Sequence, residues 1–510
     1  MSILLESQII SVITNVNGAI NSFIWGIVGI GALVLTGVLM TVVTKVFQIT
    51  HIGLWFRNTI GAIFKKGSGV LKTDDKKNIT QFQSLCTALA ATVGTGNIAG
   101  VAAAIVSGGA GAIFWMWVAA FFGMMTNFSE NVLGIYYRRK NARGEWCGGA
   151  MYYLSDGLGS KKGCKWIGKI LAILFSCFAI LASFGIGNMS QVNSIATNVK
   201  ATFGIPGWVV GLVILILVGI VIIGGIKRIA AVTEKLVPFM VVLYIIGALI
   251  IFFSHITSAG AVFGAIFKHA FGVKAVAGGF VGITVKQVVT WGFKRGVFSN
   301  EAGLGSSVMV HSCSNVKEPV QQGMWGIFEV FADTIVVCTL TAFAVLSSGV
   351  VNLETGEIIA EGVESTALVS AAFSTTFGVA GSVFITIAIL LFAFSTILGW
   401  NIYGEKAWEY LFGRKSVLAY KIVFVIVIFV GAVSTSSLAW DISDTFNGLM
   451  MIPNLIGVIV LSPQVYKITK NYLDRHKKGK DVEPMLSVFP DIQAEAAAEI
   501  KADAGSSAVE

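Results

Sequence analysis

Two stretches of the chain place glycines and polar side chains inside long apolar segments. They cover residues 90–100 (AATVGTGNIAG) and residues 296–306 (GVFSNEAGLGS). In lipid, a backbone group without its helical hydrogen bond costs several kcal/mol, so such a break survives only where it lines a cavity enclosed by protein. Paired breaks at equivalent places in two halves of a chain are typical of a transporter site near the bilayer midplane. The two breaks therefore predict a binding site for a solute.

The first break suits an anionic ligand on one side and a cation on the other. Its glycines permit non-helical dihedral angles, which leaves free amides at the start of the outer half-helix. These amides and the helix dipole attract an anionic group, for which a substrate carboxylate is the obvious candidate. The carbonyls near Ala90 and Val93, which end the inner half-helix, suit a hard cation. Glycines that only allow close helix packing are the alternative, but three polar residues between them favour a site: Thr92, Thr95 and Asn97.

The second break contains an ionisable residue. Its polar residues are Ser299, Asn300 and Glu301. A charge at membrane depth is costly, so Glu301 is a functional candidate by default. Lys294 and Arg295 are near enough in sequence to neutralise it, and structural pairing inside the bundle is an equal alternative. We expect the carbonyls of Phe298 and Ser299 to receive a substrate ammonium.

Polar residues also lie deep in the fourth and ninth apolar segments. The fourth holds Gln191 between Asn188 and Asn193, and the ninth holds Ser395, Thr396, Trp400 and Asn401. The hydroxyls of Ser395 and Thr396 are placed to complete a sodium shell with the first-break carbonyls, because sodium prefers oxygen ligands. The alternative is that both hydroxyls bond their own helix backbone.

Other ionisable residues are expected to have less direct roles. Glu329, Asp333 and Thr334 in the eighth segment are candidates for buried polar contacts. Asn127 and Glu130 are expected near the cytoplasmic end of the third segment. His255 and His311 are expected at span ends, and neither is assigned a proton-relay role.

The composition is that of a membrane protein. Of the 510 residues, 55% are hydrophobic and 12% are charged, and the mean hydropathy is +0.80. A soluble domain averages about 25% charged residues. The net charge of +9 does not indicate nucleic acid, because the basic residues lie in short loops between apolar runs. Six scattered cysteines form no C-x-x-C pair or metal spacing, so the sequence supports neither a disulfide framework nor a zinc site.

Eleven segments are long enough to span a membrane, which takes about 20 predominantly apolar residues. They are 22–44, 81–108, 110–136, 167–198, 207–226, 236–257, 283–311, 322–348, 377–403, 418–437 and 443–466. The shorter segments 258–280 and 363–376 are predicted to be re-entrant or surface helices.

The basic residues support this topology. With the N-terminus outside and the spans alternating, the predicted cytoplasmic loops hold 30 of the 36 Lys and Arg residues, and the outside loops hold three. After the first span, ten remain, and two sets of five enter the membrane from opposite sides. The interrupted segments come first in each set, which predicts an inverted repeat whose discontinuous helices meet at the centre. No sequence identity between the halves is visible, so the repeat depends on position alone.

The predicted fold is therefore an all-α polytopic membrane protein with a five-plus-five inverted repeat and one extra N-terminal span. Its predicted parts are an extracellular N-terminus (1–21), the extra transmembrane helix (22–44), a cytoplasmic linker (45–80), the first repeat (81–257), an extracellular or re-entrant connection (258–282), the second repeat (283–470) and a cytoplasmic tail (471–510). The tail is expected to be largely disordered or weakly helical.

The chain resembles the alanine or glycine:cation symporter family, also described as sodium:alanine symporters. The resemblance is carried by residues 87–102 (TALAATVGTGNIAGVA), 148–153 (GGAMYY), 187–194 (GNMSQVNS), 294–306 (KRGVFSNEAGLGS) and 400–405 (WNIYGE). The family more often has proline where Ala150 stands. The resemblance implies a leucine-transporter-like fold and sodium-driven uptake of alanine or glycine by alternating access.

The resemblance also assigns residues to the site. Residues 94–97 (GTGN) are similar to the G-x-G-N of sodium-coupled carriers of this fold. This implies a sodium site formed by the carbonyls of Ala90 and Val93 with the hydroxyls of Ser395 and Thr396. The implied substrate contacts are Gly94, Thr95, Gly96, Gln191, Phe298, Ser299, Asn300, Trp400 and Asn401. Trp400 is expected to limit the size of the substrate side chain.

The sequence contains no sign of an enzyme: it has no P-loop, no nucleophile elbow and no His/Glu metal pair on a helix. Transport must then be driven by an ion or substrate gradient, without a cofactor. The leading hypothesis is a multi-pass carrier in the cell membrane that couples sodium entry to uptake of a small neutral amino acid. One alternative keeps the fold but uses protons or carries a larger amino acid such as glutamine. Another is a channel or a sensor that binds without translocating.

Overall fold

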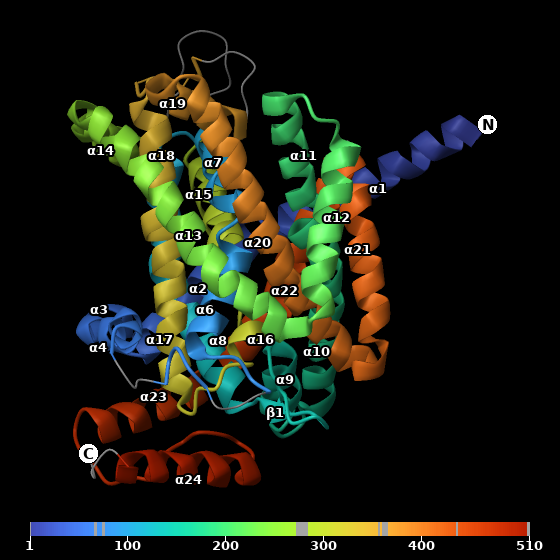
Figure 1. Ribbon diagram of the computed structural model, residues 1–510. Coiled ribbons are helices and arrows are strands. Elements are labelled where there is room, and N and C mark those ends of the chain that lie inside the picture. Colours follow the sequence, from blue (N-terminus) through green and yellow to red (C-terminus); the bar gives the residue numbers. More distant parts are fainter. Residues whose placement is uncertain are drawn as a thin grey trace.

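The computed structural model describes residues 2–65, 69–73, 77–271, 284–354, 357–359, 366–434 and 437–506, and most of their backbone is helical. In Figure 1 the long helices stand side by side, while α23 and α24 lie across one end of the bundle. In this part of the chain the one sheet is a short antiparallel hairpin that pairs Arg139 with Cys147. The predicted all-α class is confirmed.

The bounds of the elements are as follows. The first part of the chain forms α1 (Ser2–Ile24), α2 (Ile27–Val43), α3 (Phe47–Thr50), α4 (Ile52–Asn58), α5 (Ile60–Ile63), α6 (Gln81–Thr92), η1 (Thr95–Asn97), α7 (Ala99–Gly108), α8 (Gly111–Tyr136), β1 (Arg139–Lys140), β2 (Trp146–Cys147), α9 (Ala150–Tyr152) and η2 (Tyr153–Leu158). The middle forms α10 (Lys165–Phe184), η3 (Gly185–Met189), α11 (Ser190–Phe203), α12 (Gly207–Ile223), α13 (Gly225–Ser254), η4 (Ile256–Ser258), α14 (Ala259–Phe271), α15 (Val285–Asn300), α16 (Val308–His311), α17 (Pro319–Val330), η5 (Phe331–Cys338) and α18 (Thr339–Ser347). The last part forms α19 (Thr366–Phe377), α20 (Val379–Phe412), η6 (Arg414–Ser416), α21 (Val417–Val433), α22 (Ser437–Val460), α23 (Ser462–His476) and α24 (Pro490–Ser506).

Eight helices in the described residues are long and apolar enough to cross a membrane, and the bent pair α6–α7 adds a ninth. The predicted number of eleven is not reached by this measure, because α12 has 17 residues and α15 has 16, which is short of a full span. The count of eleven therefore stays a prediction. The expected short helices are found as α14 and α19, although residues 272–283, where the predicted connection ends, lie outside the described residues.

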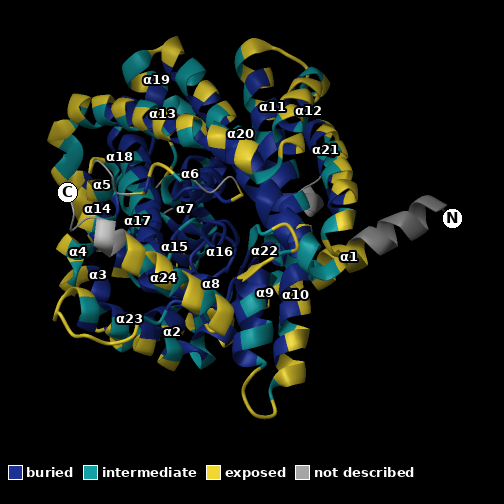
Figure 2. Cartoon of the chain, turned by 60° about the horizontal axis from the view of Figure 1, so that its bottom comes forward, coloured by how far each residue is buried: buried dark blue, intermediate teal, exposed yellow. Residues whose placement is uncertain are grey.

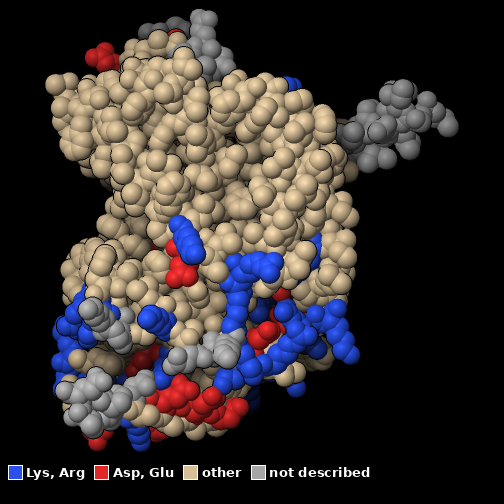
Figure 3. Space-filling view, viewed as in Figure 1, with Lys and Arg blue, Asp and Glu red and all other residues tan. Residues whose placement is uncertain are grey.

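The surface divides into an apolar belt and a charged end. Large apolar side chains are exposed around the bundle, such as Ile223 at 78% and Val379 at 83%. Figure 3 shows the Lys, Arg, Asp and Glu side chains of this face concentrated at the lower end of the molecule. We call this end, formed by residues 137–166, 224–235, 312–318 and 405–421 together with α23 and α24, the basic end. An apolar belt above a basic end is the surface that a bilayer requires.

The broken helices lie at the centre of the bundle. Residues 84–98 and 299–314 are all buried, and Figure 2 shows the buried colour gathered around α6, α7, α15 and α16. Irregular backbone is therefore shielded from the lipid-facing surface, as a membrane protein requires.

The first helix of each half begins with the same device. The Thr80 hydroxyl accepts a hydrogen bond from the Gln83 amide at 3.0 Å, and the Gln83 side chain accepts one from the Thr80 amide at 3.1 Å. Thr284 and Gln287 make the same reciprocal pair at 3.3 and 2.8 Å to start α15. These T-x-x-Q capping boxes satisfy amides that the first helical turn leaves free. They give the predicted repeat a matching feature in both halves.

The second break differs from its predicted bounds. Helix α15 continues through Asn300, and the irregular backbone begins at Glu301, which has a left-handed φ of 56°. The predicted interruption at Gly296 was wrong. Gly296 serves helix packing instead, since an added Cβ would lie 3.3 Å from the Ala119 side chain on α8.

Of the two states expected for the tail, disordered or weakly helical, the described part shows helix, in α24. Helix α24 docks on the other parts of the basic end through the ion pairs Lys140–Glu495 at 2.6 Å and Lys317–Glu499 at 3.2 Å. The Val488 amide donates to the Tyr136 carbonyl at 3.0 Å. Composition left the two states open because it does not reveal these docking contacts.

Candidate functional site

The first break lies where the sequence predicts it. After α6 the backbone extends at Val93 (φ −77°, ψ 82°) and Gly94 (φ −130°, ψ −150°), makes one 3-10 turn at η1, and resumes as α7 at a bend of 56°. The Gly94 amide donates to the Asn97 side-chain oxygen at 2.9 Å and to the Thr92 carbonyl at 2.9 Å. Asn97 therefore fixes the shape of the break, and the Gly94 amide must leave these partners before it can bind a carboxylate.

The four residues of the predicted sodium site include three that the fold brings into contact. The Ala90 carbonyl on α6 accepts hydrogen bonds from the Thr396 hydroxyl at 3.0 Å and the Ser395 hydroxyl at 3.3 Å, both on α20. Thr396 lies directly against the break, because an added Cβ on Gly94 would clash with its hydroxyl. Val93, 1% exposed, caps the same half-helix. Ser395 also bonds its own helix at 2.8 Å, so the alternative expected for it holds in part.

A small cavity of about 20 Å³ adjoins the first break. It is lined by Ala91, Thr92, Gly94, Thr95, Gly96, Ile186, Gln191, Phe298, Glu301, Thr396, Trp400 and Asn447. Six of the predicted substrate contacts are in this wall: Gly94, Thr95, Gly96, Gln191, Phe298 and Trp400. The others, Ser299, Asn300 and Asn401, are not among the lining residues.

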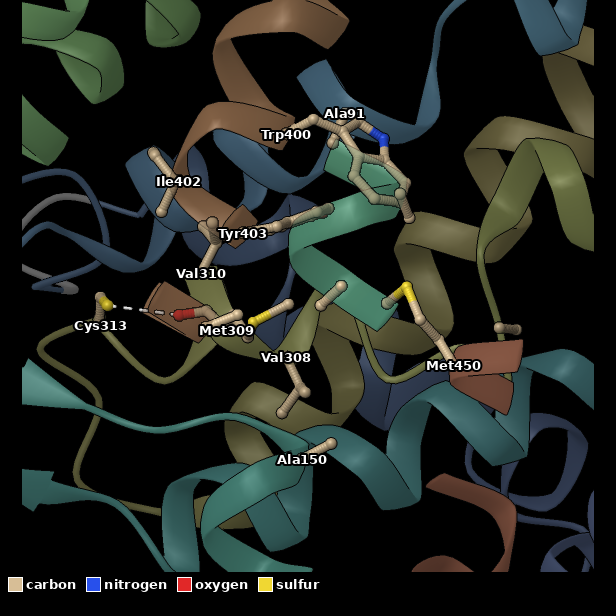
Figure 4. Packing of buried hydrophobic residues seen from close by; sticks show 14 of the residues in the cluster. Ala91, Ala150, Val308, Met309, Val310, Cys313, Trp400, Ile402, Tyr403 and Met450 are labelled. Carbon is tan, nitrogen blue, oxygen red and sulfur yellow. Dashed lines mark hydrogen bonds between the residues drawn. The ribbon is translucent and has the colours of Figure 1, made fainter. Parts of the chain in front are cut away.

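Two aromatic residues close the cavity. An added Cβ on Gly187 would clash with the Trp400 side chain, and one on Gly96 would lie 3.1 Å from the Phe298 ring. Figure 4 shows the Trp400 indole beside Ala91, with Tyr403 on the next turn of α20; the two ring centroids are 5.3 Å apart. The indole is therefore held between close-packed backbone and a second aromatic ring.

Gln191 connects the first break to a second irregular helix. Its side-chain oxygen accepts from the Thr95 hydroxyl at 3.0 Å, and its amide group donates to the Ile186 carbonyl at 2.9 Å. Ile186 lies in η3, a π-helical segment, and such segments are frequent at functional sites.

The polar residues before the second break support its backbone rather than line the cavity. The Asn300 amide group donates to the Thr334 hydroxyl at 3.0 Å, and its oxygen accepts from the Ala302 amide at 3.0 Å. Ser299 donates to Asp333 at 2.7 Å.

Asn401 is completely buried, and neither atom of its amide has a hydrogen-bond partner in the described part of the chain.

Asp333 joins the two breaks. One carboxylate oxygen accepts from Asn97 of the first break at 2.6 Å, and the other accepts from Ser299 of the second-break helix at 2.7 Å. The neighbouring Thr334 hydroxyl also donates to Asp333, at 2.8 Å. Asp333 is completely buried in the π-helical segment η5. Buried polar contacts were expected here, but the link between the breaks was not visible in the sequence.

Glu301 is not neutralised by the cations proposed for it. Lys294 pairs instead with Asp444 at 2.6 Å, and the Arg295 guanidinium stacks over Trp291 and Phe298, 5.1 and 5.5 Å from their ring centroids. Among the described residues, no Lys, Arg or His lies within 4 Å of the Glu301 carboxylate, which accepts from Ser306 at 2.5 Å and faces the cavity.

Three residues expected near span ends are buried among other polar groups. His311 and Glu329 are both completely buried and lie 3.0 Å apart, and Asn127 donates to Glu329 at 3.2 Å. Glu130 is also buried, and it binds Asn454, which donates to the Gly303 carbonyl at 2.9 Å. Their burial shows that α8 and α16 carry polar side chains into the core, and their expected positions near span ends stay predictions.

Sequence reasoning missed three residues of the cavity wall: Ala91, Ile186 and Asn447. Ala91 and Ile186 carry no polar signal. Asn447 does, since it ends the polar run Asp444-Thr-Phe-Asn447 within the apolar segment predicted at 443–466.

Comparison with known proteins places this chain in a family. The model of the "Sodium:alanine symporter family" matches residues 10–485. The sodium/alanine symporter AgcS of Methanococcus maripaludis is 42% identical over 458 residues, which cover 90% of this chain and 97% of AgcS. The probable sodium/glutamine symporter GlnT of Bacillus subtilis is 36% identical, over 92% of this chain and 93% of GlnT.

A solved structure supports the fold. The crystal structure of MhsT in complex with L-phenylalanine aligns with a TM-score of 0.50 at 13% sequence identity, and covers 78% of this chain and 99% of MhsT. MhsT has the leucine-transporter-like fold, so the predicted fold is confirmed. The helix formed by α6 and α7 is broken at residues 93–98, and the family model spans most of the chain. This chain belongs to the sodium:alanine symporter family.

Proposed function

We propose that this protein is a symporter that takes up a small neutral amino acid together with sodium by alternating access. The observation that carries the proposal is the meeting of the Ala90 carbonyl with the hydroxyls of Ser395 and Thr396 beside a small cavity at an unwound helix. The relatives are named for sodium with alanine and sodium with glutamine, which supports this class of cargo.

Sodium would bind the oxygens that join α6 to α20. The Ala90 carbonyl and the hydroxyls of Ser395 and Thr396 are uncharged and buried, and a monovalent hard cation needs oxygen dipoles rather than a second charge. The Thr396 hydroxyl now donates to Ala90, and the Ser395 hydroxyl shares its one proton between Ala90 and Phe392; with sodium bound, all three oxygens would turn their lone pairs to the ion. The ion would thereby hold the unwound helix against α20.

The amino acid would bind with its two charges on opposite sides of the cavity. The amides of Thr95 and Gly96 are proposed for its carboxylate, as expected at the start of a half-helix. Glu301 is proposed for its ammonium, because this carboxylate faces the cavity with no described cation within 4 Å. A substrate ammonium would supply the missing counter-charge, and a buried unpaired charge is costly.

The cavity walls favour alanine or glycine over larger amino acids. Trp400 packs against Gly187 and Phe298 against Gly96, so neither ring has room to retreat. We expect Trp400→Ala to raise the uptake of glutamine relative to alanine by about tenfold to a hundredfold, because each methylene excluded or admitted by an apolar pocket changes selectivity on that scale. Competition of labelled alanine uptake by glutamine measures the ratio, and an unchanged ratio would show that Trp400 does not set the limit.

Binding must change the balance between conformations for coupling to occur. A ligand shifts an equilibrium only as far as its affinities for the two states differ. Sodium between α6 and α20 would favour one arrangement of these helices, and the amino acid between the two breaks would favour closure. We propose that the basic end faces the cytoplasm, with the N-terminus outside, because Lys and Arg accumulate on that side of a membrane.

Uptake by purified protein in proteoliposomes tests the proposal. Labelled alanine, glycine and glutamine are each presented with an inward sodium gradient, with choline in place of sodium, and with an inward proton gradient. Concentrative uptake of alanine and glycine that requires sodium is the expected result. Uptake driven by protons alone would support the alternative coupling. Binding without concentration inside the vesicle would indicate a channel or a sensor and would overturn the proposal.

A further inference from the structure

A second hollow, which shares no lining residue with the transport site, lies on the membrane-facing surface at the basic end. It is a groove of about 590 Å³ between α12 and α21. Its walls are apolar side chains of the two helices, and several of these are largely exposed, including Ile223 at 78%, Leu418 at 68% and Ile426 at 57%. The volume lies in the range of small-molecule sites, which are mostly apolar with a few placed polar groups.

The polar groups at this groove are all basic. Its lining includes Arg143, Arg414, Lys415 and Lys421, and no acidic residue. Figure 3 shows Lys and Arg side chains gathered at the lower end of the molecule, on the side where Figure 1 places the end of α21. The apolar groove therefore ends at a cluster of positive charge.

Two of the four cations are fixed in place by the protein. Arg414 pairs with Glu405 at 2.6 Å, and Lys421 pairs with the same carboxylate at 3.1 Å. Lys421 also donates to the Ile222 carbonyl at 2.9 Å, which ties α21 to the end of α12. These contacts form a rigid end to the groove.

The other two cations are available to a ligand. Arg143 and Lys415 are exposed, and within the described ranges neither forms an ion pair within 4.0 Å. Arg143 extends from the turn between β1 and β2, and Lys415 from η6. The two side chains reach the groove from different elements, so they form a converging pair rather than neighbours on one helix.

We propose that this groove is a binding site for an anionic phospholipid. An acyl chain would lie along the apolar walls of α12 and α21, and the phosphate would bind Arg143 and Lys415. Basic pockets between membrane helices at the cytoplasmic side recognise acidic headgroups in this way. Arginine and lysine donate charge-assisted hydrogen bonds to phosphate oxygens, which adds to the charge attraction. The proposal does not depend on which solute the protein carries.

Native mass spectrometry of the purified full chain tests the site. The protein is mixed with phosphatidylglycerol or with phosphatidylcholine of the same acyl chains, and the retained lipid is counted. We expect preferential retention of phosphatidylglycerol. The double variant Arg143→Gln with Lys415→Gln should weaken its apparent affinity by about 30-fold, since each basic residue near a lipid headgroup contributes about fivefold.

Two further variants separate the headgroup from the chain. Lys161→Gln with Lys162→Gln removes the same charge from an exposed loop at the same end, and it should leave lipid retention unchanged. Gly219→Leu adds a side chain within the groove, where an added Cβ meets no atom within 4 Å, so the helix should fold normally. It should reduce retention of phosphatidylglycerol while all four cations remain.

Three results would overturn the proposal. The first is equal retention of the two lipids by the wild-type protein. The second is an equal loss in the two double variants, which would show a diffuse effect of surface charge. The third is full competition by inorganic phosphate with no effect of Gly219→Leu, which would show an anion site without an acyl groove. Circular dichroism of each variant confirms that a lost signal is not a folding failure.

Discussion

The two breaks begin alike and end differently. Both helices start with a T-x-x-Q capping box, at Thr80 and at Thr284. The first break is short and uncharged, and a helix of 10 residues follows it. The second begins at a left-handed Glu301 and continues to a helix of four residues. The repeat thus supplies two unwound helices, and the two have diverged in what surrounds them.

The groups that surround the two breaks also differ. Peptide groups and hydroxyls surround the first break, where the Thr396 hydroxyl reaches a backbone carbonyl. Side-chain networks surround the second, where Asn454 donates to the Gly303 carbonyl and Ser306 to Glu301. The first break offers peptide groups to a ligand, although Asn97 ties it to Asp333, whereas the second break offers the cavity only Glu301 and its other polar groups bond one another. We therefore expect the first break to move with its ligands and the second, apart from Glu301, to hold the frame.

Asp333 should give the largest effect, because it bonds to both breaks. Asp333→Ala leaves Asn97 and Ser299 as buried donors without their partner. Each stranded donor costs about 1–3 kcal/mol, so we expect transport to be abolished and the melting temperature to fall by several degrees. Thermal unfolding and uptake are measured together. A stable, active Asp333→Ala protein would show that the breaks work without this joint.

Matched glycine variants test the difference between the breaks directly. Gly94→Ala places a Cβ against the Thr396 hydroxyl, which must then leave the Ala90 carbonyl, so transport should fall at least tenfold, with a smaller loss of stability than in Gly303→Ala. Gly303→Ala forces alanine to φ 94° and against Leu33. It should cost about 1–3 kcal/mol of folding stability through backbone strain. The reverse pattern, a stability loss at Gly94 and a purely functional loss at Gly303, would contradict the assigned roles.

The sequence located the first break correctly and the second only in part, for a physical reason. The first break is shaped by residues that act on their own backbone, namely Gly94, Gly96 and Asn97. Such local effects can be predicted from the sequence alone. Gly296 looked equally helix-breaking, but it is used for contact with α8, and that contact is not local. Glycine in a membrane helix serves either purpose, and only the packing partner decides between them.

Contacts across the fold were the least predictable part of the site. The polar residues alone suggested Ser395 and Thr396 as partners of the first-break carbonyls, and the family resemblance then assigned them. The structure brings both to Ala90 across 305 positions of sequence. The partners of Lys294 and Glu301 could not be assigned in this way. A charged residue indicates that a partner is needed, but several carboxylates and cations satisfy that need equally until the helices are packed.

A medium effect is expected at the proposed sodium site. Thr396→Ala removes one oxygen near Ala90, and we expect the sodium concentration for half-maximal uptake to rise by about tenfold, the equivalent of about 1.4 kcal/mol. Thr386→Ala is the control, because it removes a buried hydroxyl from the same helix that bonds Thr202 instead. Equal sodium dependence in both variants would remove Thr396 from the site and weaken the role given to the first break.

The smallest effect is expected at the basic end, where α23 contacts the segment that follows the second break. Glu318, which precedes α17, accepts two hydrogen bonds from Arg475 of α23, at 2.6 and 2.7 Å. Burial would raise the pKa of Glu318, but hydrogen bonds from His476 and Arg475 outweigh burial and lower it below its ordinary value of 4.5. Because the pKa of Glu318 is lower in the folded protein, the Glu318–Arg475 pair stabilises the docked tail fully at pH values above the ordinary pKa of 4.5. That stabilisation is lost as the pH falls through the lowered pKa.

Acidification should therefore loosen the second half before the first. Hydrogen exchange is measured on the segments 312–330 and 81–92 at pH values from 6 to 3. As the pH falls, we expect exchange to become faster in residues 312–330 than in residues 81–92, by an amount equivalent to about 1 kcal/mol. Arg475→Gln should show this faster exchange already at pH 6 and lose most of its further dependence on acid. If both segments respond equally in the wild-type protein, acid acts on the whole bundle, and the tail has no separate role in holding the frame around the second break.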